Sequence, residues 1–241
     1  MIIYPIKWWY LPKSSLVIFL DLYNTLWLNG QNIPEWKEAI VLPIIKPRTG
    51  ASNPQCRPIS LTSVLCKITE RMKTNRLVGY LEKNNIFNDA QYGYGKASST
   101  LDQLSRLHDS VNKSIHNKGF TVWIFLDFSR AYAMLCKDGL LFKLRKMGIT
   151  GNIYNWINDF LTDRSLRVKV HAGNTLSQKF QLQNGRPTSQ GSVISPVLFL
   201  LMINDIPSVN DNSTMCSLYA DDSVLWRSGR NLTFIFSELL N

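Results

Sequence analysis

Two adjacent aspartates near the end of the chain are the residues whose types and spacing most clearly suggest chemistry. Asp221 and Asp222 lie between two short apolar runs, 215–220 and 223–226. Apolar runs around a tight polar connection predict a β-hairpin with both carboxylates at its tip. Neighbouring anions repel each other, and a divalent cation would relieve that repulsion. Magnesium suits carboxylate oxygens and keeps coordination positions open for water and phosphates.

A third carboxylate, Asp127, completes a candidate metal site. It ends the apolar run 121–126, whose pattern is typical of a strand buried on both faces, and such a strand places its last residue at a sheet edge. Asp127, Asp221 and Asp222 are therefore expected to meet and to hold two magnesium ions about 3.5–4 Å apart. Alternatively, the pair forms a solvated turn and Asp127 starts a helix, since acids are common in turns. The apolar flanks favour the metal site.

The composition points to a polyanionic partner. The chain of 241 residues has 27 Lys and Arg against 17 Asp and Glu, a formal net charge of +10. An excess of this size fits nucleic acid or an anionic membrane surface, and charge alone does not choose between them. The basic residues are spread over several segments instead of one amphipathic helix, which argues against a membrane role. The length fits one large domain or two lobes that share a core.

Cysteine usage and the apolar runs bear on the compartment. The four cysteines show no C-x-x-C spacing and the three histidines are scattered, which argues against a zinc site or a disulfide framework and fits a reducing compartment. The N-terminus lacks the pattern of a signal peptide, and no apolar run is long enough to span a bilayer. We therefore expect a soluble, intracellular protein, in the nucleus or the cytoplasm.

Hydrophobic periodicity predicts the elements that must position the aspartates. Helical spacing covers residues 14–28, 63–82, 101–118 and 153–161. Strand patterns cover 41–47 and a hairpin formed by 167–170 and 179–182. Pro43 lacks a backbone donor, so the strand over 41–47 is expected at a sheet edge.

Two motifs carry a family resemblance. They are Tyr-Ala-Asp-Asp at 219–222 and Phe-Leu-Asp-Phe-Ser-Arg-Ala-Tyr at 125–132. In these motifs the chain resembles the reverse transcriptase domain of non-LTR retrotransposons (LINE-type, jockey-like), and the similarity runs from about residue 11 to residue 226. The resemblance implies an RNA-directed DNA polymerase with an α+β fold. In that right-hand polymerase fold of fingers and palm, an antiparallel palm sheet is backed by helices.

The resemblance also implies a division of the chain. Residues 1–34 would form an N-terminal helical extension, 35–118 the fingers, and 119–241 the palm, with a fingers-like hairpin insertion around 164–186. The chain ends at Asn241, shortly after the aspartate hairpin, so the thumb of such polymerases is expected to be absent.

By the same resemblance, Asp127, Asp221 and Asp222 would be catalytic residues that bind two Mg²⁺ ions, or Mn²⁺ in their place. Tyr132 would pack beneath the incoming sugar and leave no space for a ribose 2′-hydroxyl, which favours deoxynucleotides. Core packing is the alternative role for Tyr132.

Three more residues are assigned to substrate binding by the resemblance. Arg57 would contact the triphosphate or the template, because a guanidinium fork matches phosphate oxygens; a solvated surface position is the alternative. Gln190 and Gly191 would lie against the nucleotide and the templating base. Segment 91–100 resembles a template-contacting segment of the fingers.

Several positions depart from the family pattern. Between Gly185 and Gln190 the chain has four residues where the family has two, and Gly95 and Ser98 stand where basic residues are expected. These departures favour a truncated, partly degenerate copy that keeps the fold and lacks efficient polymerisation.

Three functions remain open. The first is two-metal nucleotidyl transfer with an RNA template, a DNA primer and deoxynucleoside triphosphates. The second is a non-catalytic nucleic-acid-binding remnant, and the third is an RNA-templated RNA polymerase, which Tyr132 disfavours. The sequence leaves the oligomeric state undecided.

Overall fold

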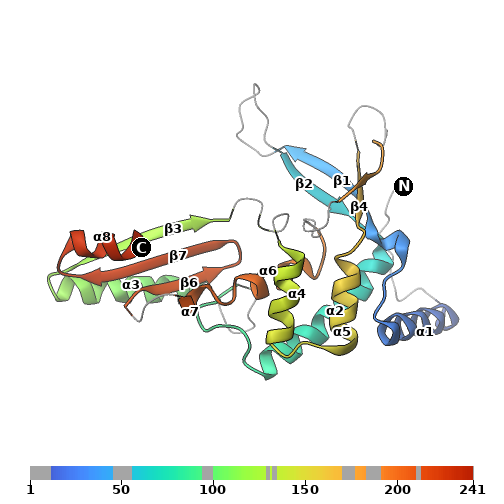
Figure 1. The fold of residues 1–241 in the computed structure, drawn as a ribbon, viewed down its shortest axis with the longest axis horizontal. Coiled ribbons are helices and arrows are strands. Elements are labelled where there is room, and N and C mark those ends of the chain that lie inside the picture. Colours follow the sequence, from blue (N-terminus) through green and yellow to red (C-terminus); the bar gives the residue numbers. More distant parts are fainter. Residues whose placement is uncertain are drawn as a thin grey trace.

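The computed structural model of the chain describes residues 12–45, 56–93, 100–128, 131, 135–169, 177–182, 191–209 and 213–240. The molecule is elongated, with a sheet at each end (Figure 1). A three-stranded sheet with two flanking helices forms one end, and a four-stranded sheet lies with the N-terminal helices at the other. None of the described helices is both long and apolar enough to cross a membrane.

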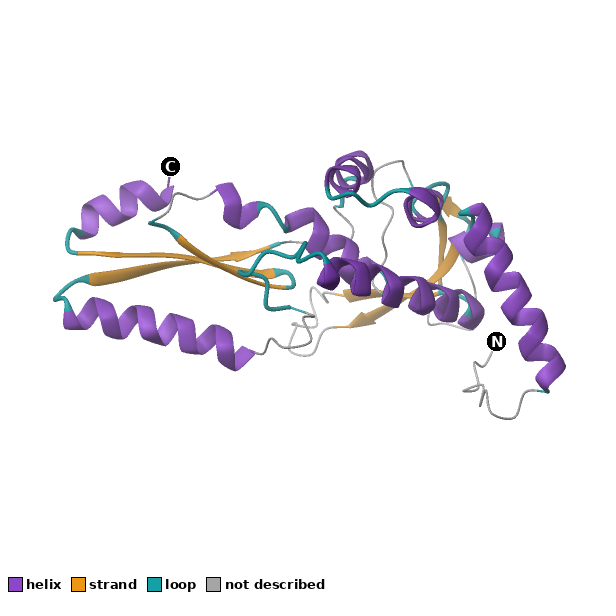
Figure 2. Cartoon of the chain, turned by 90° about the horizontal axis from the view of Figure 1, so that it is seen from below, coloured by secondary structure: helices purple, strands orange, loops and turns teal. Residues whose placement is uncertain are grey.

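The three-stranded sheet is antiparallel and contains the aspartate hairpin. Its strands are β3 (Phe120–Asp127), β6 (Met215–Tyr219) and β7 (Asp222–Gly229), in the order β3-β7-β6. The predicted hairpin is therefore confirmed. Helices α3 (Thr100–His116) and α8 (Leu232–Leu240) lie on opposite sides of this sheet (Figure 2).

Alternation along β7 explains why both faces of the sheet are covered. Val224 and Trp226 pack against Leu107 of α3, and the Trp226 indole Nε1 donates a hydrogen bond of 2.9 Å to the Ser110 hydroxyl. Arg227, the next residue, lies over the Phe234 ring of α8 at 5.6 Å. Successive residues of a strand face opposite sides, so each helix takes alternate positions of β7.

The expectation that β3 is buried on both faces is wrong. Within the described residues β3 pairs with β7 alone and is an edge strand. Its apolar side chains are largely exposed, at 51% for Phe120, 37% for Trp123, 70% for Phe125 and 39% for Leu126. A continuous apolar run suits a central strand, yet the run by itself does not determine how many neighbours the strand acquires.

The four-stranded sheet joins segments that are far apart in sequence. Its strands are β1 (Glu38–Ile45), β2 (Cys56–Leu61), β4 (Ser165–Val168) and β5 (Phe180–Gln181), in the order β2-β1-β4-β5. β1 runs antiparallel to β2 and parallel to β4. The hairpin predicted over 167–182 is present as β4 and β5, although its tip lies outside the described residues.

The expected edge position of β1 is also wrong, because β1 lies between β2 and β4. The register shows how the sheet tolerates Pro43. Among the described residues, β4 pairs with residues 38–41 of β1 and does not reach Pro43. On its other side Pro43 pairs with Pro58. The missing donor therefore falls beyond the described part of the β1–β4 ladder.

The main core lies between the two sheets, among α2 (Val64–Lys83), α4 (Lys137–Lys146), α5 (Gly151–Phe160), α6 (Ser195–Ile203) and α7 (Ile206–Val209). Helix α1 (Lys13–Asn29) and the 3₁₀ helix η2 (Pro34–Lys37) contribute to a smaller cluster of Leu26, Trp36 and Cys66. Fully buried side chains come from several of these helices and from β6: Leu81, Leu140, Leu144, Trp156, Leu198 and Leu218. Four predicted helices are confirmed as α1, α2, α3 and α5.

Candidate active site

The strand register places Asp127 directly opposite Asp222, in the last pair of the β3–β7 ladder. Side chains of directly opposed residues lie on the same face of a sheet, with their Cβ atoms roughly 4.5–5.5 Å apart. Asp221 is the preceding residue, in the turn between β6 and β7, and its carbonyl oxygen accepts a hydrogen bond of 3.5 Å from the Phe128 amide. Residues from positions 127 and 221–222 thus converge at one end of the sheet.

In the part of the chain that the structure describes, no basic side chain compensates these carboxylates. Asp127 and Asp222 are exposed and Asp221 is half-buried. Among the described residues, no lysine or arginine forms an ion pair with any of the three. Carboxylates held at neighbouring positions without a counter-charge favour a bound cation.

The donor set fits magnesium, although it does not form a closed cage. Within the described ranges, no three His, Cys, Asp or Glu side chains are arranged to hold a metal ion. Magnesium is usually bound through one or two carboxylates, with water and substrate phosphates filling its other positions. The opposed Asp127 and Asp222, with Asp221 adjacent, supply oxygen ligands of that kind. The centre with all three aspartates as ligands stays a prediction.

The turn that carries Asp221 is held by the segment 90–93. The Tyr92 amide donates to the Leu218 carbonyl and the Leu218 amide donates to the Ala90 carbonyl, both at 2.8 Å, so this segment lies along the outer edge of β6. A Cβ atom on Gly93 would lie 2.6 Å from the Ala220 backbone nitrogen. Only glycine therefore fits against the aspartate turn at this point.

Ala220 has the unusual backbone that this turn requires. Its φ of 55° lies in the left-handed region, which costs a non-glycine residue about 1–2 kcal/mol. Such strain persists only where the surrounding structure enforces it. The close approach of Gly93 and the β6–β7 ladder supply that enforcement.

A second part of the site gathers on the four-stranded sheet. Arg57 is exposed on β2, opposite Ile44. Gly191 has a φ of 119° and its backbone is pressed against Ser60 of the same strand, where a Cβ atom would collide with the Ser60 carbonyl oxygen. Residues more than a hundred positions apart in sequence thus meet on one strand.

Helix α6 connects the two parts. It begins shortly after Gly191, and its residue Phe199 packs edge-on against Phe128 with ring centroids 5.9 Å apart. Phe128 directly follows Asp127. A displacement of α6 would therefore reach the end of β3.

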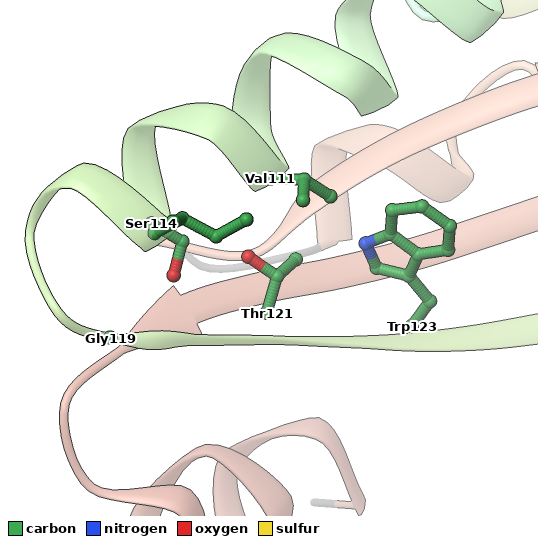
Figure 3. Close-up of a pocket in the computed structure, with 6 residues that line it drawn as sticks. Val111, Ser114, Gly119, Thr121 and Trp123 are labelled. Carbon is green, nitrogen blue, oxygen red and sulfur yellow. The ribbon is translucent and has the colours of Figure 1, made fainter.

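The cavity between α3 and β3 is not a substrate site. It has a volume of about 240 Å³, and Val111, Ser114, Gly119, Thr121 and Trp123 line it (Figure 3). Val111 and Ser114 belong to the last turns of α3, and Thr121 and Trp123 to the half of β3 that begins the strand, whereas Asp127 ends it. Sites for small organic ligands are typically about 300–1,000 Å³, and this cavity has no charged group for a phosphate.

Comparison with known proteins decides the family. Residues 45–234 match the family described as "Reverse transcriptase (RNA-dependent DNA polymerase)". The chain belongs to the reverse transcriptase family. This reverse transcriptase domain is 31% identical over 223 residues to a probable RNA-directed DNA polymerase from transposon BS of Drosophila melanogaster, with 89% of the chain and 24% of the relative covered.

The mobile element jockey of the same fly encodes a second related RNA-directed DNA polymerase. It is 28% identical over 236 residues, with 95% of the chain and 25% of the relative covered. The chain spans about a quarter of the length of these curated relatives. Among solved structures, apo telomerase from Candida tropicalis matches with a TM-score of 0.56 at 12% identity, covering 94% of this chain and 51% of that one. At that identity the likeness shows the fold alone.

The structure of this reverse transcriptase domain brings some of the predicted site residues together and does not describe others. Asp127 pairs with Asp222 beside the turn that contains Asp221, and Gly191 contacts β2, the strand of Arg57. Tyr132 and Gln190 lie outside the described residues.

Sequence reasoning missed two residues that shape the site. The sequence indicates Gly93 only as part of a template-contacting segment, although a glycine can also mark a close backbone approach. Glu70 gave no signal, since an acid among basic residues of a helix usually lies in solvent. The structure buries it instead.

Proposed function

We propose that this chain catalyses RNA-templated extension of a DNA primer by deoxynucleoside triphosphates, with divalent cations bound at Asp127, Asp221 and Asp222. The observation that carries the proposal is the pairing of Asp127 with Asp222 at the end of the β3–β7 ladder, beside the turn that contains Asp221. Membership of the reverse transcriptase family supports it. The net charge of +10 suits an RNA template and a DNA primer.

The fold supports a division into fingers and palm with one change from the sequence-based boundaries. We assign the sheet of β1 and β2 with α2 to the fingers, and the sheet of β3, β7 and β6 to the palm. The hairpin insertion around 164–186 supplies β4, which pairs with β1 of the fingers. Because Leu107 of α3 packs against Val224 and Trp226, we place α3 with the palm.

In this proposal each residue has a defined task. Asp127 and Asp222 offer carboxylate oxygens from adjacent strands, and Asp221 completes the set. When bound, two Mg²⁺ or Mn²⁺ ions would lower the pKa of the primer 3′-hydroxyl and stabilise charge on the leaving pyrophosphate. Arg57 would hold phosphate oxygens, and Tyr132 would exclude a ribose 2′-hydroxyl.

The remaining substrate contacts come from the loop before α6. Gln190 and Gly191 would lie against the nucleotide and the templating base. The contact between Gly191 and Ser60 supports this role, because it brings the loop to the strand that carries Arg57. Binding of the nucleotide between the two sheets would explain why both sheets contribute residues.

A primer-extension assay on an RNA template tests the proposal. Asp127→Asn, Asp221→Asn and Asp222→Asn are each expected to lower the magnesium-dependent rate by roughly 10²–10³-fold, the usual loss when an electrostatic stabiliser is removed. Because these carboxylates have no ion-pair partner among the described residues, the thermal unfolding temperature is expected to stay unchanged or to rise. Asp109→Asn on the exposed side of α3 is the matched control.

Other outcomes would favour the alternatives. Absence of extension by the wild type, with nucleic-acid binding in magnesium that ignores the loss of Asp127 or Asp222, would identify a non-catalytic binding remnant. The two extra residues before Gln190 favour the binding remnant as the main alternative, because a displaced loop would slow catalysis. A preference for deoxynucleotides that survives Tyr132→Ala would return an RNA-templated RNA polymerase to consideration.

A further inference from the structure

Glu70 is a buried acid that accepts hydrogen bonds from the loop before α6. It lies on α2 with 1% of its surface exposed. Its Oε2 atom accepts hydrogen bonds from the Ser192 hydroxyl at 2.7 Å, the Val193 amide at 2.7 Å and the Ile194 amide at 3.4 Å. One carboxylate oxygen thus satisfies several donors at the start of α6, where the helix dipole also favours a negative charge.

The second carboxylate oxygen of Glu70 also accepts a hydrogen bond. This Oε1 atom accepts a hydrogen bond of 3.2 Å from the Cys66 thiol. Burial lowers the pKa of Arg164, which is 3% exposed, and the nearby Glu70 carboxylate opposes that shift. A buried carboxylate is costly unless it is hydrogen-bonded, and both oxygens of Glu70 accept hydrogen bonds.

Helix α6 has no local cap that could replace Glu70. Its N-cap residue is Ile194, whose side chain makes no capping hydrogen bond. Helices are commonly capped by a Ser, Thr, Asp or Asn at that position. Here the cap comes from α2, more than a hundred residues away in sequence. This arrangement fixes the position of the loop relative to α2. A cap from a residue next to α6 would not fix that position.

A second contact from the same region holds the loop from the other end. The Gly191 backbone is pressed against Ser60, which is 3% exposed on β2. β2 leads directly into α2, so both contacts with residues 191–194 originate from one stretch of chain. Gln190 immediately precedes this clamped segment.

We propose that Glu70 is a positioning residue for the nucleotide site, which holds residues 191–194 so that Gly191 meets the incoming nucleotide. This inference rests on the proposed function of the loop. Glu70 itself touches no substrate. Its effect reaches the aspartates as well, since Phe199 of α6 packs against Phe128, next to Asp127.

Nucleotide binding without chemistry gives the direct test. A primer ended by a dideoxynucleotide is annealed to an RNA template, and the dissociation constant of the next complementary deoxynucleoside triphosphate is measured with magnesium. We expect Glu70→Ala to raise that dissociation constant about tenfold. Active sites are sensitive to small displacements, and a shift of about 1 Å can lower a reaction rate by about a hundredfold. Glu70→Gln keeps one acceptor and is expected to have a smaller effect. Affinity for the primer–template is expected to change less than twofold.

A further measurement separates positioning from stability. Amide hydrogen exchange at Val193 and Ile194 is expected to accelerate in both Glu70 variants at temperatures well below unfolding, because their acceptor is weakened or lost. Glu35→Gln removes an exposed acid from η2 and is the matched control, with no expected change.

If the Glu70 variants fail to fold, Ser192→Ala carries the test, since it removes a single hydrogen bond to Glu70. It is expected to weaken nucleotide binding in the same direction. Normal nucleotide affinity in the folded variants would overturn the inference, even if they are less stable. A wild type that binds nucleotide but does not extend a primer would refute the proposed activity and leave the inference standing. A wild type that binds no nucleotide would overturn both.

Discussion

At the scale of single residues, some charged side chains are exposed to solvent and others are fully buried. Asp127 and Asp222 are exposed and have no ion-pair partner among the described residues, while Lys73 is fully buried. The Lys73 ammonium lies 4.6 Å from the centroid of the Trp156 ring and 3.5 Å from the Leu26 carbonyl oxygen. These contacts compensate burial only in part, and burial lowers the pKa of Lys73 to about 7. The exposed carboxylates can therefore serve a ligand, whereas the buried lysine affects stability.

The depressed pKa of Lys73 makes stability depend on pH. Above pH 7 folded Lys73 is neutral, while in the unfolded chain it keeps its proton to about pH 10.4. The unfolded state thus binds more protons in this range, and stability rises with pH by up to about 1.4 kcal/mol per unit. Lys73→Met is expected to remove this rise between pH 7 and 9.

Urea denaturation at several pH values would measure the effect as the difference between wild type and Lys73→Met. Burial also raises the pKa of the Cys66 thiol, which lowers stability at higher pH. That contribution is common to both proteins and cancels in the difference. Parallel stability curves for the two proteins would show that Lys73 does not titrate in this window.

At the scale of elements, the site is assembled by close backbone contacts. Segment 90–93 lies against β6 and the aspartate turn, and Gly191 lies against β2. Hydrogen bonds from Asn32 and Lys37 to Asp159 of α5 anchor the loop after α1 in a similar way, at 2.7 Å each. In each case a connecting segment is fixed to a helix or strand that is distant in sequence.

Substitutions of two glycines, Gly93 and Gly79, are expected to change stability in opposite directions. Gly93→Ala would drive a Cβ atom into the Ala220 backbone, so we expect a loss of about 1–3 kcal/mol in stability and slower primer extension. Gly79→Ala on α2 meets no atom within 4 Å and is expected to stabilise the protein by about 0.5–1 kcal/mol. Denaturant midpoints would measure both. A neutral Gly93→Ala would mean that segment 90–93 does not brace the turn.

At the scale of the whole molecule, two sheets share one connecting core. Helix α6, buried along most of its length, runs from the loop beside β2 to the region of the aspartate hairpin. The net charge of +10 belongs to the molecule and not to one element. Distributed charge of this kind supports binding to a phosphate backbone through many weak contacts.

Binding of an RNA–DNA duplex is therefore expected to depend steeply on salt. Between 50 and 200 mM salt, affinity should fall by about a hundredfold or more, since each neutralised phosphate releases counterions. Without metal, the double variant Asp127→Asn with Asp222→Asn is expected to bind as tightly as the wild type or more tightly. Fluorescence anisotropy of a labelled duplex would measure this. Affinity that is insensitive to salt would contradict an electrostatic interface.

Local patterns predicted much of the secondary structure. The helix over 14–28, the helix over 63–82 and the aspartate hairpin all appear where their patterns indicated. A helix cap, an apolar stripe or a tight turn is encoded within a few neighbouring residues, so a short window contains the necessary information. The neighbours of a strand are not encoded locally, and for this reason the environments of β1 and β3 were predicted wrongly.

By itself, the sequence determined that three aspartates end strands or turns and that a hairpin presents two of them. Only the tertiary structure decided that Asp127 pairs with Asp222, that Gly93 supports their turn, and that Glu70 is buried against the start of α6. The reason is physical. Turn and helix preferences depend on adjacent residues, whereas register, close backbone approach and burial of a charge depend on partners that the chain brings together only when it folds.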